Sequence, residues 1–333
     1  MTRNMQKIQE KIIILNTGGT IAMSVDDDTD AVKPGEVHPL HSIEPLLKQY
    51  VQVEMVDIFN IPSPHMTPGM MLELSQQASS LLAKPEVTGV VVTHGTDTLE
   101  ETAYFLDITS TSEKPIIVTG AMRSSNELGA DGPINLVQSV RVAADPQSRG
   151  RGTLVVFNDE IHAARYVTKT HTSNVATFQS PQHGPVGIVA KKSVQFNQPP
   201  LRSRQYQPEY ADCSVPLMKM VTGFDPLWLE CLLSRPFDGL VIEAFGAGNV
   251  PPAVLAPLKE VIARKIPVVM VSRCYNGYVQ DLYGYEGGGV QLKEMGVIFC
   301  NGLNGQKARI QLIAALQSGI TASELSAHFS TSI

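Results

Sequence analysis

The chain has 333 residues, enough for two domains of ordinary size or for one large domain. Lysine and arginine number 26 against 32 aspartates and glutamates, and the net charge of −6 gives no electrostatic reason to bind nucleic acid or an anionic membrane. Charged residues make up 17% of the chain, below the roughly 25% of ordinary soluble domains. This deficit indicates a surface that another subunit covers.

The cysteines and the N-terminal residues favour a reducing compartment. Cys213, Cys231, Cys274 and Cys300 fit neither a CxxC pair nor a dense disulfide framework, so we expect free thiols. Residues 1–15 contain no apolar segment followed by a small-residue cleavage site, and no run of about 18 apolar residues occurs in the chain. We therefore expect a cytoplasmic protein.

Short apolar runs rich in valine and isoleucine recur along the chain. Runs of this kind are typical of strands that are buried on both faces of a sheet. They occupy residues 12–15, 90–92, 116–118, 154–157, 240–242, 268–271 and 297–299.

Helical patterns separate these runs. Thr67 before Pro68 predicts an N-cap and a first turn, residues 131–144 predict a second helix, and Thr321 with Glu324 has capping-box spacing before a short last helix. Because parallel neighbours need crossover connections, the alternation predicts an α/β fold with a mostly parallel sheet flanked by helices.

A polar, proline-containing stretch interrupts the alternation. We predict a linker over residues 196–216, which divides a larger N-terminal α/β domain of residues 1–195 from a smaller C-terminal α/β domain of residues 217–333. The segments described next place the predicted catalytic residues entirely in the first domain.

The first predicted strand ends in T-G-G-T-I at residues 17–21, where ligands bind in open α/β sheets. Its two glycines would let the backbone approach a substrate closely. The alternative is a plain strand-to-helix turn with Thr20 as its cap. The segment is neither a dinucleotide fingerprint nor a P-loop, because the required glycine and lysine spacings are missing.

Polar residues follow three later strand or loop positions. Residues 93–98 read T-H-G-T-D-T, in which Asp97 or Thr98 could simply cap the next helix and His94 could be structural. Residues 120–123 offer backbone groups beside a small side chain. Residues 167–172 place Lys169 among hydroxyls, with a solvated surface lysine as the alternative.

These groups could form a proton relay. A threonine hydroxyl is a poor nucleophile until a base takes its proton, and a lysine can be that base when its surroundings lower its pKa. Lys169 beside Thr96 and Asp97 would form a Thr-Lys-Asp relay suited to acyl transfer without a metal.

Metal-assisted hydrolysis is the main competing chemistry. No HExxH motif occurs, and His38 with His41 forms only a weak HxxH pair near Glu36 and Glu44. The GxSxG elbow of serine hydrolases is absent as well. We therefore expect neither a metal nor a serine nucleophile.

Taken together and in this order, the segments resemble the signatures of bacterial-type L-asparaginases, the asparaginase/glutaminase family. The resemblance covers nearly the whole chain and is carried by residues 17–22, 93–98, 120–123, 130–136, 167–170, 175–178, 246–249 and 304–309. It implies a two-domain asparaginase-like fold and hydrolysis of L-asparagine to L-aspartate and ammonia through an acyl-enzyme, without a cofactor.

The resemblance also assigns residues. Thr20 matches the family's nucleophile, and Thr96, Asp97 and Lys169 match its second threonine and relay partners. The backbone N–H of Thr96 would help to hold the oxyanion.

Substrate contacts follow from the same matches. Asp97 would also bind the α-ammonium group, Ser63 resembles the serine that binds the α-carboxylate, and Ala121 would contribute its backbone to the leaving amide. Ser63 could instead be a turn residue. Asn249 matches a partner-subunit asparagine approximately.

The chain departs from the family pattern near the site. Related enzymes often carry a tyrosine on the mobile loop after the nucleophile, but residues 24–35 contain none, and the next tyrosine is Tyr50. Some relatives place a glutamate of a neighbouring subunit against the substrate; Tyr283 and Glu286 are both candidates here. The family picture predicts a homodimer or homotetramer with its sites near a subunit interface.

Three other functions are alternatives to an L-asparaginase. A glutaminase-asparaginase would differ only by room for one methylene, a discrimination of ~1–3 kcal/mol. The amidase subunit of a transfer-RNA amidotransferase carries a further domain before the first threonine motif, whereas only sixteen residues precede Thr17. A non-catalytic small-ligand binding module would need a broken relay, and all four relay positions are intact.

Overall fold

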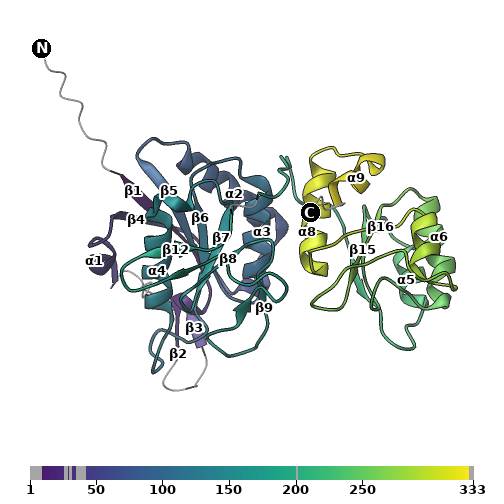
Figure 1. The fold of residues 1–333 in the computed structure, drawn as a ribbon, viewed down its shortest axis with the longest axis horizontal. Helices are drawn as coiled ribbons and strands as arrows, with labels where there is room; N and C mark the ends of the chain where they lie inside the picture. Colours follow the sequence, from purple (N-terminus) through teal and green to yellow (C-terminus); the bar gives the residue numbers. More distant parts are fainter. Residues whose placement is uncertain (1–9, 26–28, 30–31, 35–42, 200–201, 330–333) are drawn as a thin grey trace, which may run out of the picture. The chain divides into compact units, whose positions relative to one another are not determined.

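The computed structural model describes residues 10–25, 29, 32–34, 43–199 and 202–329, which form two compact units (Figure 1). The first unit comprises residues Met1–Ser203 and the second comprises Arg204–Ile333. The predicted linker, residues 196–216, spans this division, and the last strand of the first unit ends at its first residue, Phe196.

The first unit is built on an eight-stranded sheet with the order β12-β11-β8-β7-β6-β5-β1-β4. Strands β4, β1, β5, β6 and β7 are parallel, and β7, β8, β11 and β12 pair antiparallel. Their bounds are β1 Lys11–Gly18, β4 Gln52–Ile61, β5 Val87–Thr93, β6 Ile116–Thr119, β7 Thr153–Phe157, β8 Glu160–Ala163, β11 Gly187–Val189 and β12 Val194–Phe196. The apolar runs of the first half thus lie in β1, β5, β6 and β7, as predicted.

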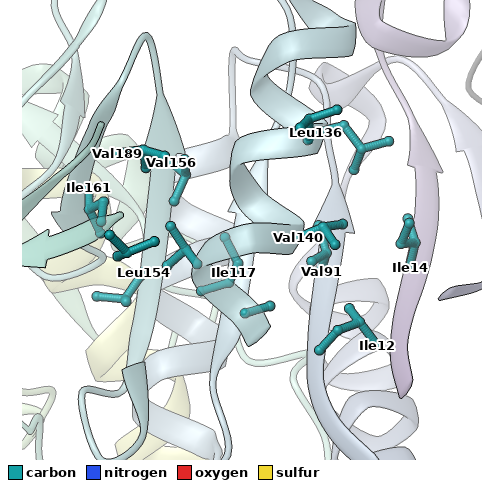
Figure 2. Close-up of a cluster of buried hydrophobic side chains, with 14 of the residues drawn as sticks. Ile12, Ile14, Val91, Ile117, Leu136, Val140, Leu154, Val156, Ile161 and Val189 are labelled. Atoms are coloured by element: carbon teal, nitrogen blue, oxygen red, sulfur yellow. The ribbon is translucent and has the colours of Figure 1, made fainter. Parts of the chain in front are cut away.

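Helices cover both faces of this sheet, which explains the continuous apolar runs. Ile12 and Ile14 of β1 pack with α4 (Gly132–Ala144) on one face, and Figure 2 shows this cluster. Ile13 and Leu15 pack with α2 (Pro68–Leu82) and α3 (Leu99–Thr109) on the other face. These four residues of β1 therefore pack against a helix on whichever face of the sheet they lie.

The predicted helix starts are confirmed. Thr67 caps α2 by accepting a hydrogen bond from the Met70 N–H at 3.2 Å. A short helix, α1 (Glu44–Leu47), precedes β4. Smaller elements complete the unit: the hairpin of β2 (Met23–Val25) and β3 (Val32–Pro34), the pair β9 (Thr168–Lys169) and β10 (Phe178–Gln179), and the 3-10 turns Thr20–Ala22, Ser63–His65 and Pro146–Ser148.

The second unit has a four-stranded parallel sheet with the order β13-β14-β15-β16 around its own core. The strands are β13 Leu217–Lys219, β14 Leu240–Ala244, β15 Val268–Ser272 and β16 Ile298–Phe299. The helical segments are α5 Leu227–Leu232, the 3-10 turn Pro252–Val254, α6 Leu255–Ala263, α7 Gly289–Glu294, α8 Gly305–Gln317 and α9 Ala322–Phe329.

Three further expectations can be compared with the structure. The Glu324 carboxylate accepts from the Thr321 N–H at 3.0 Å, the return bond of a capping box. All four cysteines are free thiols. Within the part of the chain that the structure describes, no helix is long and apolar enough to cross a membrane.

Candidate active site

Four neighbouring parallel strands deliver the predicted site residues to one edge of the sheet. Strands β4, β1, β5 and β6 lie side by side in that order. Ser63, Thr20, Thr96 and Ala121 each follow the carboxyl end of one of them, within a few residues of Ile61, Gly18, Thr93 and Thr119. Since the carboxyl ends of parallel strands meet at one edge, residues far apart in sequence gather there.

Polar side chains tie these strand ends together. Asn16 of β1 donates to the Asp57 carboxylate of β4 at 2.7 Å. Thr93 of β5 donates to the Asn16 side-chain oxygen at 3.1 Å, and Thr17 donates to the Thr93 carbonyl at 2.8 Å. Thr17, Thr93 and Asn16 are buried, so these bonds are shielded from water and hold the turns above them in register.

Two glycines let the first and second motifs touch. A Cβ atom on Gly19 would lie 2.2 Å from the Cα of Gly95, and one on Gly95 would lie 2.8 Å from Ser63 Oγ. Gly19 also has φ +80°, a conformation that residues with side chains rarely adopt. The backbone contact brings together the turns that carry Thr20 and Thr96, the residues that follow the two glycines.

Lys169 contacts both of its expected partners. Its Nζ atom donates to Thr96 Oγ1 at 2.9 Å and to Asp97 Oδ1 at 2.7 Å. Thr96 is buried, and the Lys169 side chain is 17% exposed, whereas the Asp97 side chain is 60% exposed. The cluster thus runs from a shielded threonine to an open carboxylate, and Asp97 can meet a ligand that arrives from solvent.

Ser63 belongs to the same cluster. Its buried hydroxyl accepts from the Asp97 N–H at 3.1 Å, and its carbonyl accepts from Thr98 Oγ1 at 2.8 Å. Neither Asp97 nor Thr98 caps α3 with its side chain. Thr98 thus occupies the N-cap position of α3 without a side-chain capping bond, because its hydroxyl turns to the Ser63 loop instead.

His94 is a fully enclosed structural histidine. Its Nδ1–H donates to the Gly95 carbonyl at 2.7 Å, and its Nε2 accepts from the Thr102 hydroxyl at 2.9 Å. Burial lowers the pKa of His94 from 6.5 to about 4, and the bond to Gly95 offsets this only in part. The ring is neutral near pH 7, and it braces the backbone directly before Thr96.

Asp131 and Asn135 have a part that sequence reasoning missed. The Asp131 carboxylate accepts from the N–H groups of Met122 at 3.0 Å and Arg123 at 2.9 Å. Asn135 donates to the Gly120 carbonyl at 3.1 Å, so both sides of Ala121 are held. An aspartate before a helical proline resembles an N-cap, and only the folded loop reveals that Asp131 makes no side-chain cap.

The remaining predicted residues are Thr20, three residues of the second unit and the weak metal-site group. Thr20 is partly exposed and begins the 3-10 turn Thr20–Ala22. Asn249 belongs to the second unit, where its side-chain oxygen is buried without a hydrogen-bond partner, and Tyr283 and Glu286 of that unit are exposed. His38, His41 and Glu36, the weak metal-site alternative, lie outside the described residues.

The chain belongs to the asparaginase family. The family model for the asparaginase N-terminal domain matches residues 11–202, and the model for the glutaminase/asparaginase C-terminal domain matches residues 214–329. Together these cover both units of the structure and confirm the family and the two-domain fold that the motifs indicated.

Individual relatives agree with this assignment along almost the whole chain. A probable L-asparaginase of Deinococcus radiodurans is 38% identical over 95% of this chain and 95% of its own. A probable periplasmic L-asparaginase of Haemophilus influenzae is 36% identical over 92% of this chain and 88% of its own. The crystal structure of a probable cytoplasmic L-asparaginase from Campylobacter jejuni matches with a TM-score of 0.85 and 31% identity, covering 96% of this chain and 99% of that one.

Proposed function

We propose that this protein hydrolyses L-asparagine to L-aspartate and ammonia, with Thr20 as the nucleophile and Thr96, Asp97 and Lys169 as its proton relay. Its family and the names of its relatives support the reaction. The observation that carries the residue assignment is the hydrogen bonding of Lys169 to Thr96 and Asp97, beside the turn that bears Thr20.

The first half of the reaction transfers the acyl group to the protein. The Thr20 hydroxyl attacks the side-chain amide carbon, and the developing oxyanion is held by backbone N–H groups that include that of Thr96. The hydroxyl proton ends on the leaving nitrogen, the C–N bond breaks, and ammonia departs. An ester between the aspartyl group and Thr20 remains.

The second half releases the product. Water attacks the ester carbon and gives a proton to Thr96, while the Thr96 proton moves along the 2.9 Å contact to Lys169, which later returns a proton to the Thr20 oxygen. The ester bond breaks, and Thr20 recovers a proton as aspartate leaves. Asp97, at 2.7 Å from the same amine, stabilises the lysine whenever it is charged.

Substrate binding uses groups around the relay. The exposed carboxylate of Asp97 pairs with the α-ammonium group, Ser63 meets the α-carboxylate, and the backbone of Ala121 holds the leaving amide. Asn249 supplies a further contact in the assembled protein.

We further infer a homodimer or homotetramer with sites near a subunit interface, and a cytoplasmic location. Exposed aromatic residues of the second unit, Tyr275, Tyr283 and Tyr285, support a covered surface there. The Campylobacter jejuni relative is described as cytoplasmic, whereas the Haemophilus influenzae relative is named periplasmic. Sedimentation of the pure protein and fractionation of its native cells test these two inferences.

A glutaminase-asparaginase of broader specificity is the second candidate. The C-terminal family model is described as glutaminase/asparaginase, and this description supports glutaminase activity as a second candidate. The two candidates share the relay, and they differ in whether the pocket admits one more methylene group.

Ammonia release from L-asparagine, L-glutamine and D-asparagine separates these proposals. We expect release from L-asparagine by the wild type and almost none by Thr20→Ala, while Thr20→Ser keeps part of the activity because it keeps a hydroxyl. Equal turnover of L-glutamine would favour the broader enzyme. Undiminished turnover by Thr20→Ala would exclude Thr20 as the nucleophile.

Lys169→Met tests the relay separately. We expect this variant to fold and to lose most of its activity near neutral pH. Lys11→Met is the matched control, because Lys11 pairs with Glu54 at the same 2.7 Å but at the start of β1, the end of the strand away from the motifs. Equal activity of the two variants would remove Lys169 from the mechanism.

A further inference from the structure

The loop between β6 and α4 holds the strand that follows Thr20. Asn126 makes a pair of hydrogen bonds with one residue of β2: its side-chain oxygen accepts from the Val25 N–H at 2.8 Å, and its side-chain nitrogen donates to the Val25 carbonyl at 2.9 Å. Ser125 adds its N–H and its hydroxyl, which both donate to the Met23 carbonyl, at 3.0 and 2.9 Å. Strand β2 is therefore bonded to this loop as well as to β3.

The loop is itself anchored to the rest of the site. The Ser124 N–H donates to the Glu127 carboxylate at 3.0 Å, and the N–H groups of Met122 and Arg123 donate to Asp131. Asp131 directly precedes α4, which packs on the central sheet. The position of β2 is therefore fixed, through this loop, by the same framework that holds Ala121.

A second contact links the two sides nearer to Thr20. Ile21, the residue after it, is almost completely buried. A Cβ atom on Gly132, the first residue of α4, would lie 2.9 Å from Ile21 Cγ1 and 3.3 Å from the Cβ of Ala121. Ile21 thus fills the space between the Thr20 turn and the Ala121 loop, and β2 begins only two residues later.

We propose that Asn126 is a positioning residue that sets Thr20 against Ala121 by fixing the strand β2. The inference rests on the proposed function, since it gives Thr20 the attack and Ala121 the leaving amide. An amide side chain suits this task because it carries one acceptor and one donor group, which match the N–H and C=O of a single residue. Asn126 is exposed, so its bonds add little to stability and act mainly on the placement of the strand.

The test compares Asn126→Ala and Asn126→Asp with Asp145→Ala. Asn126→Asp keeps an acceptor for the Val25 N–H but turns a second acceptor to the Val25 carbonyl. Asp145 is a partly exposed residue that also holds one backbone N–H, that of Gln147 at 2.9 Å, but at the opposite end of α4. The control therefore loses a similar bond away from Thr20.

We expect kcat for L-asparagine to fall about tenfold in both Asn126 variants with KM changed less than about threefold, the size expected when bonds that orient a reacting group are lost. The melting temperature should stay within about 2 °C of the wild type, and Asp145→Ala should keep the wild-type kcat. A merely structural loss would lower the melting temperature without this split between kcat and KM.

Hydrogen exchange provides a readout that needs no activity. The peptide over residues 20–25 should exchange faster in Asn126→Ala than in the wild type, because the Val25 N–H loses its acceptor. Unchanged exchange, or wild-type kcat in both variants, overturns the inference. If Thr20→Ala is inactive while the Asn126 variants behave as wild type, the proposed function stands and only this inference fails.

Discussion

The enclosed imidazole of His94 predicts that the protein loses stability on mild acidification. Burial lowers the pKa of His94 from 6.5 to about 4 in the folded chain, whereas the unfolded chain keeps the ordinary value. Between these two values the unfolded state binds a proton that the folded state does not, so the free energy of unfolding falls as the pH falls. Below about pH 4 both states are protonated, and this contribution is lost.

The size of the stability loss follows from the shift in the pKa of His94. At about 1.4 kcal/mol per pH unit, a pKa lowered from 6.5 to about 4 corresponds to about 3 kcal/mol of unfolding free energy, present above pH 6.5 and lost through the interval. Protonation also changes the contact with Thr102: the ring can no longer accept from that hydroxyl, so the 2.9 Å hydrogen bond must reverse its direction, with Nε2–H donating to the hydroxyl oxygen.

Urea unfolding of the wild type and of His94→Gln, at one fixed protein concentration and at several pH values from about 7 to about 4.5, measures this contribution. Glutamine does not titrate, and all other groups titrate alike in both proteins. The wild type should therefore lose about 2–3 kcal/mol more than the variant over this range. Parallel curves for the two proteins would refute the reasoning, whatever their absolute stabilities.

Three further substitutions test other parts of the structure. Gly19→Ala should cost more than about 2 kcal/mol of unfolding free energy and at least tenfold in ammonia release, since its methyl group would meet Gly95 at 2.2 Å; activity near the wild-type level would contradict the contact. Lys265→Gly should raise the unfolding free energy by about 0.5–1 kcal/mol without altering activity, because Lys265 directly follows the C-cap residue of α6 and has φ +61°; a lower melting temperature would argue against strain there. Ser203→Ala should lower the unfolding free energy, measured in urea, by about 1–3 kcal/mol, because the buried Asp107 carboxylate loses a donor at 2.5 Å. An unchanged unfolding midpoint would mean that another group replaces the hydroxyl.

Much of the fold could be predicted because short-range patterns decide it. The run at residues 12–15 is apolar at every position, and the structure buries alternate residues of β1 under α4 and under α2 and α3. Thr67 before Pro68 is equally local, since a cap and the residue after it act within one turn. Where a single turn or a single strand determines the outcome, the sequence contains the whole signal.

The strands that were missed lack that signal. Strand β4 is at the edge of the sheet, and most of its residues are at least partly exposed, so its ten residues mix polar and apolar types. Strands β11 and β12 have three residues each, and β12 forms the other edge of the sheet with β11 beside it. Edge strands need little apolar surface because one side has no neighbour, and a continuous apolar run is then no guide.

The site shows the same division between local and distant causes. Residue types alone suggested that Lys169 joins Thr96 and Asp97, and the structure places these side chains in contact. The role of Asp131 could not be found in that way, because its partners Met122 and Arg123 offer only backbone N–H groups, which every residue carries. A side chain that binds the backbone leaves no complementary residue in the sequence.

The contact of Gly19 with Gly95 explains why the threonine turns meet at all. The two glycines are distant in sequence, and each one alone would indicate only a tight turn. Their shared cause is the strand order, which sets β1 beside β5 with Asn16 opposite Thr93, so that the two turns begin at the same level of the sheet. A methyl group on Gly19 would push these turns apart, and we infer that the glycines are needed for the approach of two backbones rather than for the bend of either one.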